Sequence, residues 1–261
     1  MIKFFRNIRK QLLGEGKTGK YFKYAIGEIL LVVIGILIAL QINNWNEQQK
    51  DNKLEQEYYC RLMEDVILDE EKINTLLAAS QERLKAANQA ARLLQQEQAK
   101  KIETANFLSV AIRAIYADFK PNDAAFVDLK SGANLNIIKD KPVISALNNY
   151  FNKVEGYISI VKVNGENAVK IFYSYDDVFA NGWAQASLQS GWVAEGVEPD
   201  VRAAIELNEN EVFDAAMQYR LYNDALQFIS HNQRQIILYK YIKDEIATLK
   251  GVLETKCSAT N

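Results

Sequence analysis

The stretch that decides the architecture is Ile29–Leu40, which reads ILLVVIGILIAL and holds twelve residues without one polar side chain. Twelve apolar residues are short for a membrane span and would also suit a signal-peptide core or a buried helix. The flanking residues favour a membrane span, because Tyr24 and Trp45 lie on either side of the run as aromatic residues do at membrane interfaces. The helix between them would cover about 32 Å, close to a hydrocarbon layer of about 30 Å. We therefore expect residues 24–45 to form a transmembrane helix.

Charge is unevenly distributed on either side of this run. Residues 1–23 hold seven basic side chains and one acidic one, whereas the whole chain has 31 basic against 33 acidic residues. The first segment thus carries +6 and the remainder −8. Basic residues before a span mark its cytoplasmic side. We predict that residues 1–23 form a basic, amphipathic cytoplasmic segment on the membrane surface, and that residues 46–261 lie outside the cytoplasm, behind an uncleaved signal anchor.

Helix-forming residues dominate the chain beyond the span. No glycine or proline occurs between Ile36 and Phe119, and glutamate, glutamine, lysine, leucine and alanine are frequent. The span is therefore expected to continue into a long helix over residues 46–99, for which we consider one break near Ser80. Together these patterns predict an all-α fold, in which an N-terminal interfacial helix and one transmembrane helix lead into an extracytoplasmic helical bundle over 46–261.

Capping residues predict where the later helices begin. Thr104 is expected to cap a helix that runs through Tyr116. Asp140, with Pro142 in the first turn behind it, is expected to cap a helix that runs to about residue 180. The last helices are predicted over residues 198–207 and 210–253.

Two blocks of sequence carry a resemblance to a known family. Gly27-Glu28-Ile29 followed by LVVIGILIALQINNWNE (Leu31–Glu47) is similar to the N-terminal signature of an uncharacterised family of single-pass membrane proteins from Bacteroidota-type bacteria. A second block, from Tyr116 to Ile138, also resembles that family. The resemblance implies a single-pass topology, which in such bacteria places the span in the inner membrane and residues 46–261 in the periplasm. The family has no assigned activity, so the resemblance contributes no catalytic residue.

Glu28 is a candidate functional residue because a carboxylate at the edge of the hydrocarbon is costly. We favour an interfacial anchor, in which Lys23 or a lipid headgroup pairs with it. The alternative is a helix–helix interface, since Glu28, Gly35 and Ala39 share one helical face and Gly35 and Ala39 form a small pair that permits close approach. Trp45 completes the expected anchor. The expected partners are the lipid bilayer, other envelope membrane proteins or a second copy of the chain.

A second candidate site is the loop over residues 181–197, the only long segment that combines glycine and serine. The carboxylates Asp176 and Asp177 precede it in an aromatic setting, and Trp183 and Trp192 lie within it. Long loops are often functional, so these four residues are candidates for ligand binding. Aromatic side chains at helical spacing more often belong to a core, and we favour that interpretation.

Residues for catalysis or cofactor binding are scarce. A single histidine, His231, and two cysteines distant in sequence cannot build a zinc, haem or iron–sulfur site in one chain. Asp65 and Asp69, one helical turn apart, are expected on a solvated face rather than in a cation site. We predict no catalytic, cofactor-binding or metal-binding residue. Nucleic acid is not an expected partner, because the basic residues flank the span and the remainder is acidic.

The two cysteines leave two alternatives open. Cys60 lies near the start of the predicted bundle and Cys257 near the end of its last helix. An antiparallel arrangement would bring them together on the side of the membrane where disulfides persist. We nevertheless expect free thiols.

These observations favour a non-enzymatic interaction or scaffold component of the bacterial cell envelope. The alternative is an extracytoplasmic sensing or ligand-binding domain that uses the 181–197 loop. Since the predicted cytoplasmic part has only about 25 residues, such a sensor would need a signalling partner.

Overall fold

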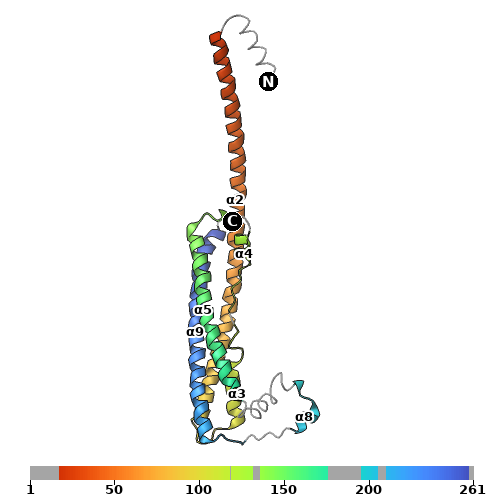
Figure 1. The fold of residues 1–261 in the computed structure, drawn as a ribbon, viewed down its shortest axis with the longest axis vertical. Helices are drawn as coiled ribbons and strands as arrows, with labels where there is room; N and C mark the ends of the chain where they lie inside the picture. The colour runs from red at the N-terminus through yellow and green to blue at the C-terminus, as the bar shows by residue number, and fades with distance from the viewer. Residues whose placement is uncertain (1–17, 118, 132–135, 176–194, 205–209, 259–261) are drawn as a thin grey trace. The chain divides into compact units, whose positions relative to one another are not determined.

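The computed structural model describes residues 18–117, 119–131, 136–175, 195–204 and 210–258 (Figure 1). Over these ranges the protein is all-α, as expected, with six helices, no strand and one isolated bridge between Lys100 and Val212. The chain divides into two compact units, Met1–Glu57 and Tyr58–Asn261. The predicted interfacial helix in residues 1–17 lies outside the described residues.

Helix α2 (Thr18–Leu94) is a single helix of 77 residues that contains the whole predicted span. The predicted continuation beyond Trp45 is confirmed, although the helix ends at Leu94 rather than near residue 99. The helix break that we considered near Ser80 does not occur, because α2 is continuous through this residue. Its hydroxyl donates to the Leu76 carbonyl oxygen at 2.8 Å, so the polar side chain is accommodated inside the helix.

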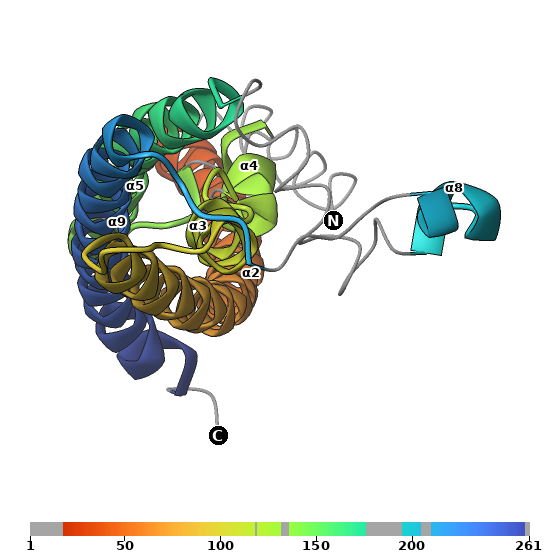
Figure 2. The same cartoon turned by 90° about the horizontal axis from the view of Figure 1, so that it is seen from below.

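The second unit contains the C-terminal part of α2 and five further helices. These are α3 (Lys101–Ile112), α4 (Ala124–Ser131), α5 (Lys141–Tyr173), α8 (Pro199–Ala204) and α9 (Ala215–Cys257). The long helices run beside one another (Figures 1 and 2), with α5 packed along α9 and α3 packed against both.

Helix starts are set partly by local sequence and partly by long-range contacts. Asp140 caps α5 as predicted, because its side chain accepts a hydrogen bond from the Val143 amide at 3.4 Å. The predicted cap at Thr104 is wrong: α3 begins at Lys101, and Thr104 is buried inside it. The Lys101 amide donates to the Glu211 carbonyl at 2.8 Å, so a distant segment fixes where α3 starts.

The core of the bundle changes character along its length. At the end where α2 gives way to α3, nine buried core residues are alanine, which lets helix backbones approach closely. They are Ala86, Ala87, Ala90, Ala91, Ala99, Ala105, Ala111, Ala168 and Ala225. Toward the other end the core is filled by larger side chains such as Ile73 and Ile246.

Candidate functional site

The apolar run in α2 is bare in the structure. Every residue from Ile29 to Leu40 is exposed, and the large hydrophobic side chains among them are 43% to 65% accessible. The most apolar window of the helix has a mean hydropathy of 2.6 and none of it is buried. Such a continuous run of exposed apolar side chains differs from the singly scattered ones on ordinary soluble proteins. By length and composition, this helix suits a membrane anchor.

The predicted face of the apolar run is also uncovered. Glu28 is half-buried, whereas Gly35, Ala39 and Trp45 are exposed. A methyl group added at Gly35 would meet nothing within 4 Å. Ala39 and Trp45 line a shallow groove together with Ile42, Asn43 and Asn46. The four residues predicted to form an anchor or interface therefore lie on one helix in the first unit, where Gly35, Ala39 and Trp45 are accessible and Glu28 is half-buried.

The two cysteines form a disulfide, which corrects the expectation of free thiols. The sulfur atoms of Cys60 and Cys257 are 2.02 Å apart and the Cα atoms 4.9 Å apart. Helix α9 has 43 residues and runs antiparallel to the part of α2 in the second unit. Its last residue thus reaches the level of Cys60. The separation of 197 residues in sequence hides this proximity.

Asp69 is a buried carboxylate, contrary to the solvated face expected for it. It accepts hydrogen bonds from the Tyr150 hydroxyl at 2.6 Å and from the Asn122 backbone and side-chain amides at 2.8 Å each. Burial raises the pKa of Asp69, although these three hydrogen bonds act in the opposite direction. Burial and the neighbouring carboxylate also raise the pKa of Tyr150. Asp69 therefore joins α2, the segment before α4, and α5.

Asp65 lies one turn from Asp69 but makes a different contact. It accepts a hydrogen bond from the Ala125 amide at 3.0 Å, at the start of α4. In the described ranges, no group of three histidine, cysteine or acidic residues is arranged to hold a metal ion. The pair consequently serves to fasten α4 and its preceding segment to α2.

Arg83 forms a second buried polar cluster between α2 and α9. Its guanidinium donates to the Asn232 and Gln235 side-chain oxygens at 3.0 and 2.8 Å, and to the Ser80 hydroxyl at 2.7 Å. Burial lowers the pKa of Arg83. The two amides in turn donate to the backbone carbonyls of Ala111, in the last turn of α3, and of Ile115, three residues beyond the helix. Helical spacing alone gave no signal for this cluster.

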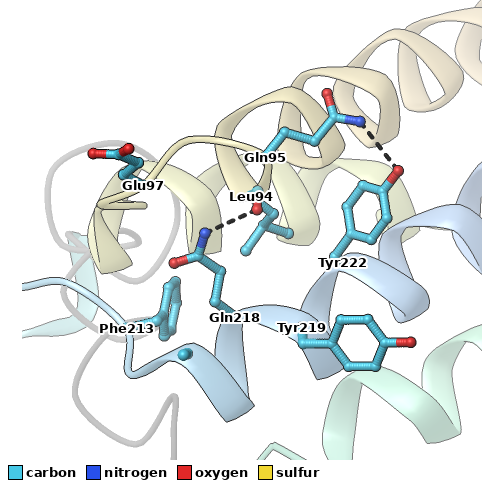
Figure 3. A pocket seen from close by; sticks show the side chains of 8 residues that line it. Leu94, Gln95, Glu97, Phe213, Gln218, Tyr219 and Tyr222 are labelled. Carbon is cyan, nitrogen blue, oxygen red and sulfur yellow. Dashed lines mark hydrogen bonds between the residues drawn. The ribbon is translucent and has the colours of Figure 1, made fainter.

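A pocket of about 460 Å³ lies where α2 ends and α9 begins (Figure 3). We call it the α2-end pocket. Gln218 donates to the Leu94 carbonyl at 2.9 Å, and the Gln95 amide donates to the Tyr222 hydroxyl at 3.1 Å. Its lining consists of Leu94, Gln95, Glu97, Phe213, Ala215, Gln218, Tyr219 and Tyr222. None of these residues was nominated from the sequence, because α2 and α9 are more than a hundred residues apart.

The remaining candidates from the sequence are His231 and the 181–197 loop with the residues assigned to it. Asp176, Asp177, Trp183, Trp192 and nearly all of the 181–197 loop lie outside the described residues. His231 is half-buried in α9, and its Nε2 lies 3.2 Å from the Asn167 side-chain amide. Burial lowers its pKa.

The fold and these features define a class of protein: an all-helical chain in which one helix, apolar enough to cross a membrane, continues into a disulfide-closed bundle. The chain belongs to a family of unknown function, DUF6090, which matches residues 28–176. The match starts at Glu28 and includes the second block, Tyr116–Ile138. No curated protein and no solved structure matches the chain.

Proposed function

We propose that this protein is a single-pass anchor in the bacterial inner membrane, with its N-terminus in the cytoplasm and its helical bundle in the periplasm. There it acts through protein contacts, as a scaffold or interaction component of the envelope. The observation that carries the proposal is the disulfide between Cys60 and Cys257, three residues beyond the first unit.

The disulfide supports this orientation because such bonds persist in oxidising compartments and are rare in the cytosol. The charge distribution supports it independently, since the basic residues precede the span and such residues favour a cytoplasmic N-terminus. The bare apolar face of Ile29–Leu40 supports insertion into lipid, where its exposure carries no penalty. Three separate physical effects therefore favour the same topology.

A binding role is preferred over catalysis on chemical grounds. Both cysteines of the chain are joined to each other, so neither offers a thiolate nucleophile. The only histidine is half-buried, and burial lowers its pKa. These features favour a protein that works through its surfaces.

The topology is tested with epitope tags at either end of the full chain, expressed in a bacterium and converted to spheroplasts. An external protease is expected to remove the C-terminal tag and to spare the N-terminal tag until the cells are lysed. The opposite pattern overturns the orientation. Release of the intact protein from membranes by alkaline carbonate overturns the anchor.

Self-association through α2 is the form of interaction that the face of Glu28, Gly35 and Ala39 favours. Small residues spaced four apart let two helices approach closely in lipid, and Gly35 has open space around it. Replacing Gly35→Ile is expected to reduce disulfide-independent crosslinking of the full chain in membranes. Gly27→Ile, about 100° away around the helix, is the matched control. Equal crosslinking of the two variants and the wild type would exclude this interface.

A further inference from the structure

One face of α2 is uncharged from the apolar run to the residues just beyond it. Side chains that alternate at steps of three and four residues lie on one side of a helix, as in a coiled coil. On the face of Gly35 and Ala39, this spacing selects residues that we call the α2 seam: Val32, Gly35, Ala39, Ile42, Asn46 and Gln49. All of them are exposed. The next positions on either side are the charged Glu28 and Lys53, so the uncharged seam has defined ends.

Asn46 offers hydrogen-bonding groups on the α2 seam. It lines the shallow groove together with Ala39 and Ile42. The neighbouring Asn43 donates to Glu47 at 3.2 Å, whereas within the described ranges no group bonds to the Asn46 side-chain amide. An amide has both donors and an acceptor, so it is complementary to a second amide. A second amide therefore satisfies Asn46 in a way that the acyl chain of a lipid cannot.

A second copy of the chain supplies such an amide at the same depth in the membrane. This step rests on the proposed function, in which α2 crosses the membrane once and in one direction. Two copies with that topology lie parallel, and a two-fold axis between them brings each residue level with its own counterpart. Asn46 of one copy then faces Asn46 of the other. In parallel two-stranded coils, one asparagine at such a position fixes the register of the pair.

The small residues of the seam bring the two helices close enough for this contact. With glycine and alanine facing each other, helix axes can approach to about 8 Å. Asn46 lies about 10 Å beyond Ala39 along the helix axis. At the usual crossing angle of about +20°, the axes have separated there to about 9 Å. Paired asparagine side chains can bridge that spacing.

The opposite face of α2 also carries amides but lacks the small residues. Its amides are Gln41, Asn44 and Gln48, and they follow Ile34 and Leu37 on that side. These two large side chains are 43% and 58% exposed, and they hold a second helix farther away than glycine and alanine do. The α2 seam is therefore the face on which a close helix contact and an amide occur together.

From this arrangement we propose that two copies of α2 form a parallel, in-register pair, in which the Asn46 side chains hydrogen-bond to each other at the outer end of the span. Gly35 and Ala39 form the close contact within the lipid. In this geometry Lys50 lies beside the Trp45 ring of the second copy, and such rings attract cations. Like charges on the seam meet only at its two ends, so the contact is confined to the uncharged residues between them.

Cysteine crosslinking in membranes tests the face and the register of the pair. Cys60 and Cys257 are already joined, so one added cysteine provides a free thiol in the full chain. Gln49→Cys places this thiol on the seam, and Gln48→Cys, nearly opposite Asn46 around the helix, is the matched control. We expect mild oxidation to link two copies severalfold faster through residue 49 than through residue 48. Equal rates, or faster linkage through residue 48, overturn the proposal.

The contribution of the Asn46 amide is tested with Asn46→Ala and its matched control Asn44→Ala on the opposite face. Dimerisation of the full chain in neutral detergent micelles is followed by energy transfer between two fluorescently labelled samples. We expect Asn46→Ala to weaken dimerisation by about three- to tenfold, because an interhelical hydrogen bond is lost. Asn44→Ala should dimerise as the wild type does. Equal dimerisation of the two variants overturns the Asn46 contact.

Gly35→Ile separates this inference from the proposed interface in the same assay. If Gly35→Ile weakens dimerisation and Asn46→Ala does not, the interface through α2 stands and the Asn46 contact is overturned. If the wild type does not dimerise, self-association is overturned together with the Asn46 contact. The membrane topology is judged separately, by the experiment with the two terminal tags.

Discussion

At the scale of single residues, Asp69 is a buried side chain on which three hydrogen bonds depend. One carboxylate satisfies Tyr150 and both amides of Asn122. In Asp69→Asn, the amide keeps one acceptor oxygen and presents an NH₂ group to donors. We expect a loss of about 1–3 kcal/mol in the free energy of unfolding, measured by chemical denaturation of the full chain in micelles. Glu64→Gln, exposed on α2, is the control and should change little.

The pH dependence of the stability difference between the wild type and Asp69→Asn tests whether the pKa of Asp69 is raised. Burial raises the pKa of Asp69 above its ordinary value of 3.8, so the folded state binds this proton more readily than the unfolded chain. Acidification through that range therefore stabilises the wild type relative to Asp69→Asn. The difference in unfolding free energy is expected to widen as the pH falls from neutral toward 3.8, then level off. A difference that narrows over this range would contradict the raised pKa.

His231 is expected to titrate below its ordinary pKa of 6.5, because burial disfavours the charged imidazolium. The unfolded chain then takes up the proton first, so the stability that the neutral ring provides is lost as the pH falls below 6.5. Since the chain has one histidine, NMR of the untagged protein yields a single titration curve. His231→Gln should remove this component of the acid destabilisation. A measured pKa at or above 6.5 would refute the prediction.

At the scale of elements, α5 contains a matched pair of glycines. A methyl group at Gly165 would lie 3.1 Å from the Ile115 carbonyl oxygen and 3.3 Å from the Tyr116 Cα, both backbone atoms that cannot rotate away. Gly165→Ala is therefore expected to cost about 1–3 kcal/mol of stability. At Gly156 the same methyl group meets nothing within 4 Å, so Gly156→Ala should gain up to about 1 kcal/mol. Denaturant unfolding of both variants measures the two changes in unfolding free energy. Changes of the same sign would contradict the prediction.

How far each element could be predicted depends on how local its causes are. Asp140 and Pro142 lie within one turn of the start of α5, so this helix start could be predicted from the sequence. The start of α3 depends on Glu211, which is more than a hundred residues away in sequence. The prediction of a helix start from Thr104 used local sequence only and was therefore wrong. Ser80 resembled a helix breaker, but its hydroxyl bonds within α2 and accepts from Arg83.

The candidate sites follow the same rule. The apolar run and its flanks form one continuous segment, so the proposed anchor was found from sequence alone. The α2-end pocket, the Asp69 contacts and the disulfide each join segments that helical periodicity treats separately. Their residues could be named only once the order and direction of the helices were known.

At the scale of the whole molecule, the disulfide makes the second unit a closed covalent ring. The ring from Cys60 to Cys257 contains all of α3, α4, α5 and α8, most of the bundle portion of α2, and α9. Without the bond, the C-terminal end of α9 would be held to its neighbours only by noncovalent contacts, such as the ion pair of Lys256 with Asp140. The bond therefore limits how far the unfolded bundle can expand.

Removing this ring is expected to lower the stability of the bundle more than any surface change. The double variant Cys60→Ser, Cys257→Ser should lose about 2–5 kcal/mol of unfolding free energy, because a long loop is no longer closed in the unfolded chain. A reductant should bring the wild type to the same level and leave the double variant unchanged, as followed by denaturant unfolding in micelles. The contrary result is a wild type whose thiols become reactive in the reductant while its unfolding midpoint stays the same. That result would show that noncovalent packing alone sets the stability of the second unit.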